Sequence, residues 1–212
     1  MTRETNTKKR GRPCRSPEQQ DLMKNAIIDT AKKLFVNRGF DSVSIRNISM
    51  EVNISPMTFY QVFKNKRALL YHIWDDIFAE VAYIETNIRE TEKKPENQVK
   101  KIVQEVTRYW LEHPDHFKVI FMYQDKPSSD TGSYYADGSI STATKQGLHQ
   151  TLKEGCKAGI FRQHETKAIV ESIYMQILGV AMTYITIPEY SWEEIDTTIN
   201  VIVDGILANL RK

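Results

Sequence analysis

The sequence predicts an all-α fold. Apolar residues recur at helical spacing along most of the chain, Ser, Asn and Pro stand where helices would begin, and no segment alternates like a half-exposed strand. The 212 residues are 41% hydrophobic and 26% charged, which is ordinary for a soluble protein and excludes a disordered chain. We expect one large domain or two small ones.

The first predicted helix begins after Ser16. Ser16 can cap it, Pro17 suits its first position, and Gln19 can complete a capping box. Gly39 is placed to end the helix. Its expected apolar stripe consists of Leu22, Ala26, Ile27, Ala31, Leu34 and Phe35.

Two short helices separated by a tight turn are expected next. The first spans about residues 44–52, and the second begins at Pro56 after the capping residue Ser55 and ends near Phe63. Asn65 can cap a longer fourth helix, whose wide apolar stripe fades in the polar segment 89–94.

Beyond Pro95 the pattern indicates a helical bundle. Pro114 starts a new helix, and residues 125–138, rich in Pro, Ser, Asp and Gly, form a loop long enough to act as a lid. The remaining helices are expected around Leu148 and Leu152, at about 166–187 and at about 192–210.

Charge is distributed unevenly along the chain. Residues 1–66 hold 13 Lys and Arg against 6 Asp and Glu, a formal charge of +7, whereas the rest holds 16 against 21, or −5. A basic first third suggests contact with a polyanion.

Secretion and membrane insertion are not indicated. Cys14 and Cys156 lie far apart without a CxxC pair, which argues against a disulfide framework and favours the cytoplasm. Residues 1–15 lack the apolar core of a secretory signal. The apolar stretch 169–187 carries Glu171 and Gln176, so we expect a helix buried against protein rather than a membrane span.

The two short helices, with the first helix as support, have the pattern of a helix-turn-helix. The start of the third helix would enter the major groove, and hydroxyls at helix starts would meet phosphates. The candidate DNA contacts are Ser44, Ser55, Pro56, Met57, Thr58, Tyr60, Gln61, Lys64 and Lys66.

The segment GFDSVSIRNISMEVNISPMTFYQVFKNKRALL, residues 39–70, resembles the DNA-binding signature of the TetR (tetracycline-repressor) family of transcriptional regulators. The resemblance covers roughly residues 20–75 and extends beyond them only in length and helix order. The matching positions are Gly39, Phe40, Ile48, Ser55, Thr58, Tyr60, Phe63, Lys66 and Leu69.

The resemblance implies roles for single residues. Thr58, Tyr60 and Lys66 fall on common phosphate-contact positions, and Arg46 falls where some members contact a guanine. Asn53 and Met57 stand where the family often has Gly; the bulky Met57 can touch a thymine methyl.

The basic stretch before the first helix contains Arg10-Gly11-Arg12-Pro13, which resembles an AT-hook. Gly11 would let the backbone approach the floor of an A·T minor groove, and Arg10 and Arg12 would meet its negative potential. The alternative is a basic tail that adds only nonspecific affinity.

Aromatic residues of the second half have two interpretations, helical core or the lining of a cavity for a small apolar or aromatic effector. The candidate lining residues are Trp110, Phe117, Phe121 and Tyr174. His113, Asp115 and His116 form the one tight cluster of possible metal ligands, but Pro114 marks a helix start, so we expect caps and no metal or other cofactor.

Together these observations predict a basic arm (1–15), a helix-turn-helix domain (16–65) and a helical ligand-binding and dimerisation domain (66–212). The expected function is a cytoplasmic homodimeric repressor, joined through its last two helices and released from a pseudo-palindromic operator by a small molecule. The alternatives are an activator, a nucleoid-type binder without effector, or a helical small-molecule-binding or enzymatic protein that does not bind DNA. No catalytic motif supports an enzyme.

Overall fold

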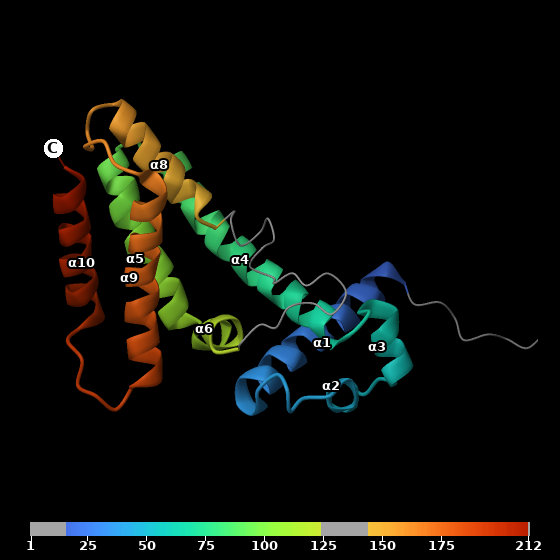
Figure 1. Cartoon of the computed structure of the whole chain (residues 1–212). Helices are drawn as coiled ribbons and strands as arrows, with labels where there is room; N and C mark the ends of the chain where they lie inside the picture. Colours follow the sequence, from blue (N-terminus) through green and yellow to red (C-terminus); the bar gives the residue numbers. More distant parts are fainter. Residues whose placement is uncertain (1–15, 124–143, 212) are drawn as a thin grey trace, which may run out of the picture.

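The computed structural model describes residues 16–123 and 144–211. Within these ranges the secondary structure is helical apart from one isolated bridge between Phe161 and Arg211, so the predicted all-α class is confirmed. The helices, labelled as in Figure 1, are α1 (Pro17–Arg38), α2 (Ile45–Glu51), α3 (Pro56–Val62), α4 (Lys66–Thr91), α5 (Pro95–Glu112), α6 (Pro114–Phe121), α8 (Gln146–Lys157), α9 (Thr166–Thr186) and α10 (Ile195–Leu210).

The long helix α4 connects the two ends of the molecule. It begins beside α1 and α3 and extends to α8, on the opposite side of the structure (Figure 1). Helix α5 packs against α4, α8, α9 and α10, while α6 packs against α1. The N-terminal helices therefore meet the C-terminal bundle through α4 and α6.

Side-chain caps start the first four helices; those at Ser16, Ser55 and Asn65 were predicted, whereas the cap at Ser44 was not. Ser16 and Gln19 form the expected capping box, with Gln19 N–H donating to Ser16 Oγ at 3.3 Å and Ser16 N–H donating to Gln19 Oε1 at 3.2 Å. Ser44, Ser55 and Asn65 each accept a backbone N–H from three residues further on. These short-range bonds fix the angles at which the chain enters α2, α3 and α4.

The predicted caps at the start of α6 are wrong. His113 is the N-cap residue, but its side chain makes no capping hydrogen bond. Pro114 occupies the first helical position, where its missing N–H costs no helical hydrogen bond and its fixed φ suits the helix. Asp115 lies in the first turn, where the helix dipole favours a negative charge.

The predicted apolar stripe of α1 is wrong at its beginning. Leu22 is 65% exposed and Ala26 is also exposed, whereas Ile28, which was not predicted, is buried. All buried residues of α1 lie between Ile27 and Phe35, so its first turns contribute none. Helical spacing shows which residues share a face, but not how much of that face a neighbouring helix covers.

The predicted stripe of α4 forms the centre of the core. Of its predicted members, Phe78 is only half-buried, and the others are buried: Leu69, Leu70, Ile73, Trp74, Ile77 and Val81. The indole Nε1 of Trp74 donates to Val119 O at 3.0 Å, so this buried donor has a partner and ties α4 to α6. Burying each aliphatic side chain contributes about 1.5–3 kcal/mol.

Helix α9 has one buried and one exposed face. Val170, Ile173, Tyr174, Ile177 and Ala181 are buried, whereas its other face leaves Met175 and Met182 exposed. Of the helices in the described ranges, α9 is long and apolar enough to cross a membrane by length and composition, and 28% of its most apolar window is buried. The expectation of burial against protein therefore holds for one face only.

The last helix begins at Ile195, three residues after the predicted start. Residues before it fold back onto the end of α9: Trp192 Nε1 donates to Ile187 O at 2.8 Å, and the Trp192 ring packs on Tyr184 and Tyr190. These contacts hold Trp192 in the connection between α9 and α10 rather than in the helix.

A buried polar cluster joins α4 to α8 and α9. The carboxylate of Glu85, on α4, accepts the N–H of Leu148 at 3.0 Å, at the start of α8. The hydroxyl of Tyr174, on α9, lies within hydrogen-bonding distance of Glu85 Oε1 and of Thr144 O. Burial raises the pKa of Glu85 to about 7, although its hydrogen bonds from Tyr174 and backbone N–H groups act the other way.

Candidate nucleic-acid interface

The turn between α2 and α3 sets the angle of the two helices. Asn53 has a φ of 56°, in the left-handed region, and Ile54 N–H donates to Ser49 O at 2.9 Å. Asn tolerates this conformation better than most residues with a side chain. The turn therefore forms although Asn53 stands where the resemblance leads one to expect Gly.

Helix α3 turns one face inward and leaves the other free. Phe59 is fully buried, whereas Met57 is 71% exposed, Tyr60 is 53% exposed, and Pro56 and Gln61 are exposed as well. The exposed residues lie in the first two turns of the helix, which are the part that contacts base edges in a helix-turn-helix.

Three of the predicted hydroxyl contacts, Ser44, Ser55 and Thr58, also have structural roles. Thr58 is buried, and its Oγ1 lies 2.9 Å from the Oγ of Ser55, the N-cap of α3. Ser44 Oγ donates to Asn47 Oδ1 at 2.5 Å and accepts Asn47 N–H at 3.1 Å. Both serine residues are exposed, so a phosphate can approach their hydroxyl oxygens and the N–H groups beside them.

The half-buried Lys66 is bound to the protein backbone. Its Nζ donates to Phe40 O and to Val43 O, both at 2.7 Å, and lies 4.1 Å from the centroid of the Phe40 ring. Desolvation lowers the pKa of Lys66 despite the neighbouring Asp41. Lys66 thus fastens the start of α4 to the turn before α2, a role that the sequence did not suggest. The other two predicted basic contacts of this region, Lys64 and Arg46, are exposed.

An α2–turn–α3 unit supported by α1, with an exposed face at the start of α3, is a helix-turn-helix of the DNA-binding class. Residues 27–73 match the model of the bacterial regulatory proteins of the tetR family. The helix-turn-helix unit at the N-terminal end of the chain is therefore of the tetR-family type.

Curated relatives match over part of their length. The chain is 33% identical over 93 residues to the uncharacterized HTH-type transcriptional regulator YuxN of Bacillus subtilis (strain 168), covering 42% of this chain and 31% of YuxN. It is 24% identical over 103 residues to the HTH-type transcriptional repressor NicS of Pseudomonas putida, covering 49% of each protein. The matches thus span a third to a half of these relatives.

Solved structures share the fold over most of the chain. A bacterial regulatory protein in the tetR family from Rhodococcus RHA1 superposes with a TM-score of 0.72 at 18% identity, covering 89% of this chain and 97% of that one. The fatty acid degradation regulator FadR from Bacillus halodurans gives 0.73 at 14% identity, covering 92% and 97%. At this level of identity the likeness shows the fold.

The predicted ligand residues divide into two groups. The rings of Trp110, Phe117 and Phe121 pack together with centroids 4.8–5.9 Å apart. Trp110 and Phe117 are buried, and among the described residues the Trp110 Nε1 has no hydrogen-bond partner. Tyr174 instead belongs to the polar cluster with Glu85.

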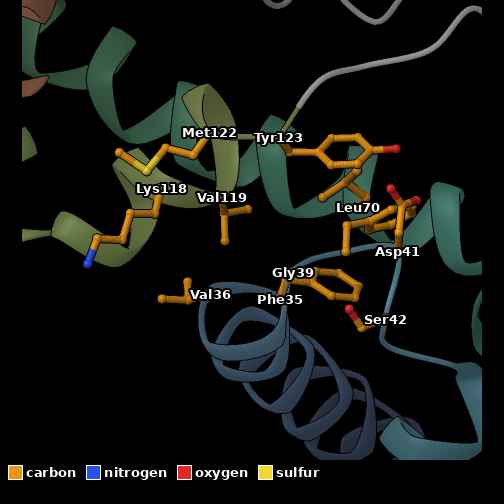
Figure 2. A pocket seen from close by; sticks show the side chains of 11 residues that line it. Phe35, Val36, Gly39, Asp41, Ser42, Leu70, Lys118, Val119, Met122 and Tyr123 are labelled. Atoms are coloured by element: carbon orange, nitrogen blue, oxygen red, sulfur yellow. The ribbon is translucent and has the colours of Figure 1, made fainter. Parts of the chain in front are cut away.

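A pocket of about 480 Å³ lies where the N-terminal helices meet α6 (Figure 2). Its volume is within the usual range for a small-molecule site, and none of the four predicted ligand residues lines it. The pocket is formed by segments that are far apart in the sequence, so the spacing of apolar residues within single helices could not predict it. Its lining residues are Phe35, Val36, Gly39, Phe40, Asp41, Ser42, Leu70, Lys118, Val119, Met122 and Tyr123.

Phe40 links this pocket to the helix-turn-helix. Its ring lies 5.1 Å from that of Phe35 and 4.6 Å from that of Tyr123, while its carbonyl accepts from Lys66. Phe40 thus belongs both to the wall of the pocket and to the turn that precedes Ser44, the N-cap of α2. The predicted arm contacts Arg10 and Arg12 and the predicted lid 125–138 lie outside the described residues.

Proposed function

We propose that the protein is a TetR-family regulator that binds a pseudo-palindromic operator as a homodimer and represses transcription until a small molecule releases it. The observation that carries the proposal is the exposed face of α3, where Met57, Tyr60 and Gln61 stand free on a helix whose other side is anchored by the buried Phe59. In a dimer two such helices would enter successive major grooves, about 34–36 Å apart.

The exposed residues have different expected roles. We assign Tyr60 and Lys64 to phosphate contacts and Arg46 and Met57 to base contacts, and keep Ser44, Ser55 and Gln61 as further contacts. We reassign Lys66 to positioning, because its ammonium group is held by two protein carbonyls. Arg10 and Arg12 remain candidates for the minor groove.

The proposed dimer interface consists of the exposed faces of α9 and α10. Met175 and Met182 on α9 and Val201 on α10 are exposed large apolar residues, and a side chain at Gly179 or Gly205 would meet no neighbour within 4 Å. A partner's helices would bury this apolar surface in a four-helix arrangement.

Helix α4 is the proposed connection between effector and DNA. Lys66 ties its first residue to the turn before α2, and Glu85 ties its far end to α8 and α9. A small apolar or aromatic effector seated against Trp110, Phe117 and Phe121 would shift α6 and α4. A coupling of about 1–3 kcal/mol would lower operator affinity about 5- to 150-fold.

Fluorescence anisotropy with the intergenic DNA beside the gene tests DNA binding. Tyr60→Phe should weaken binding to all sequences, whereas the matched variant Tyr83→Phe, at an exposed tyrosine on α4, should not. Lys64→Ala should reduce the slope of log affinity against log salt by about 1, and Arg46→Ala should alter base preference. If Tyr60→Phe, Lys64→Ala and Arg46→Ala all bind like the wild type, the exposed surface of the α2–turn–α3 unit does not bind the operator.

Light scattering at fixed protein concentration tests the interface. Met175→Arg should shift the mass from dimer to monomer, while Met50→Arg, a methionine of equal exposure on α2 (69% against 70%), should leave the dimer intact. A dimer unaffected by Met175→Arg would place the interface elsewhere.

In vitro transcription from a promoter that carries the operator separates the rival functions. Repression relieved by an added compound supports the proposal, stimulation supports the activator, and binding without any effect on transcription supports a nucleoid-type role. Binding of small molecules without any binding of DNA supports the alternative of a small-molecule-binding protein without operator function. We propose no enzymatic activity for the chain and place it in the cytoplasm together with its DNA.

A further inference from the structure

The corner between α5 and α6 holds two histidines and an aspartate that no role described above employs. One potential ligand atom from each of His113, Asp115 and His116 lies within 4.8 Å of the other two. The two imidazole rings are stacked, with centroids 5.0 Å apart and planes 17° from parallel. Since His113 makes no capping bond, helix capping does not account for its place.

A hydrogen-bond relay fixes which nitrogen of His116 carries the proton. The Tyr109 hydroxyl donates to Glu80 Oε2 at 2.8 Å and lies 2.8 Å from His116 Nδ1. Because the hydroxyl has a single hydrogen, its oxygen accepts from Nδ1–H, and the lone pair of His116 is then on Nε2. Metal-ligating histidines have the same arrangement, in which the second nitrogen donates to an outer-shell acceptor.

From this geometry we infer that His113, Asp115 and His116 bind a divalent transition metal, with Zn²⁺ as the representative ion. Two imidazoles and one carboxylate suit Zn²⁺, Co²⁺ or Ni²⁺ better than Mg²⁺ or Ca²⁺, which prefer oxygen ligands throughout. Asp115 is exposed and both histidines are half-buried, so an ion can enter from solvent and keep a water as a further ligand. The inference does not depend on the proposed DNA-binding function.

The surrounding charges favour a cation only moderately. Asp115 would bind the ion directly and Glu80 would balance it through Tyr109, whereas Lys32 on α1 opposes it. The positive end of the α6 dipole also opposes a cation, but this effect is weak for an exposed site and is screened by salt. We therefore expect an affinity in the micromolar range rather than that of a structural zinc site.

Titration of the EDTA-treated full-length protein with Co²⁺ tests the inference. We expect one Co²⁺ per chain, visible d–d absorption from nitrogen and oxygen ligands, and its loss when Zn²⁺ displaces Co²⁺. His113→Ala and His116→Ala should each abolish this spectrum. Tyr109→Phe should keep the ligands but weaken binding about 10- to 100-fold, because the relay no longer orients His116.

Two controls make the result decisive. His149→Ala, at an exposed histidine on α8, should bind Co²⁺ like the wild type. Cys156 Sγ lies 3.7 Å from His164 Nε2, and an ion there would show thiolate-to-metal charge transfer in the near ultraviolet.

Three results would overturn the inference. They are no Co²⁺ binding, Co²⁺ binding by His113→Ala and His116→Ala that equals that of the wild type, or a thiolate-to-metal charge-transfer band from the only bound ion. If either histidine variant fails to fold by circular dichroism, the exposed Asp115→Asn serves in its place, with at least tenfold weaker binding expected.

Discussion

Replacing Glu85 by Gln should change how stability depends on pH. Glu85 is 1% exposed, and its carboxyl group shares the single hydrogen of the Tyr174 hydroxyl with Thr144 O. When Glu85 is ionised, Tyr174 can donate to only one of these two acceptors. When Glu85 is protonated, its own O–H donates to Tyr174 and the tyrosine hydrogen goes to Thr144, so every group has a partner.

The size of the effect follows from the pKa. Burial raises the pKa of Glu85 from 4.5 to about 7, so between these values the folded state holds a proton that the unfolded state has lost. The contribution of Glu85 to the free energy of unfolding is therefore greatest below pH 4.5. It falls as the pH rises to about 7 and is constant at higher pH. The total fall is about 3 kcal/mol.

Gln imitates the protonated carboxyl, since its N–H can donate to Tyr174 and its carbonyl oxygen can accept from Leu148. Glu85→Gln should match the wild type near pH 4.5 and exceed it at pH 8 by about 1–3 kcal/mol. Urea unfolding from pH 4.5 to 8, at one protein concentration, measures the difference between the two curves. Other titrating groups are common to both proteins and cancel in that difference.

Glu90→Gln provides the control, because Glu90 is an exposed glutamate on the same helix. Its curve should run parallel to that of the wild type. If Glu85→Gln also runs parallel to the wild type, or is less stable than it at pH 8, then Glu85 is ionised in the folded protein and the hydrogen-bond argument is wrong.

Three further variants test single contacts. Lys66→Met removes both hydrogen bonds to the turn before α2 and should lower the free energy of unfolding by about 1–2 kcal/mol, as measured by urea unfolding. The affinity of this variant for the operator should also fall in the anisotropy assay. Gly155→Ala places a Cβ 2.2 Å from the buried ring of Phe161 and should cost about 1–3 kcal/mol in the same unfolding experiment; an unchanged midpoint would mean that the ring moves freely. Asn53→Ala at φ 56° should cost about 1 kcal/mol, whereas Asn53→Gly should not destabilise, as calorimetry can check.

Local sequence patterns were sufficient for the helix-turn-helix. Ser44, Ser55 and Asn65 cap their helices through bonds that span three residues, and the turn at Asn53 is equally short-ranged. The residues that make these bonds are neighbours in the chain, so the sequence predicted the helix starts after Ser55 and Asn65 and the tight turn between the two short helices.

The contacts that tertiary structure decided join residues far apart in the chain. The sequence predicted that Lys66 contacts a phosphate. In the folded protein its ammonium group lies 2.7 Å from Phe40 O and from Val43 O, which are more than 20 residues away in the chain. Trp74 on α4 and Val119 on α6 are likewise far apart in the chain, and the indole Nε1 of Trp74 donates to Val119 O at 3.0 Å.

By itself the sequence determined an all-α protein with a DNA-binding N-terminal unit, because helix spacing and caps depend on residues within a few positions of one another. Tertiary structure alone decided what each polar group meets. The Glu85 carboxyl, Tyr174 and Thr144 come from separate segments, and the pKa and role of such groups depend on burial and partners that packing creates.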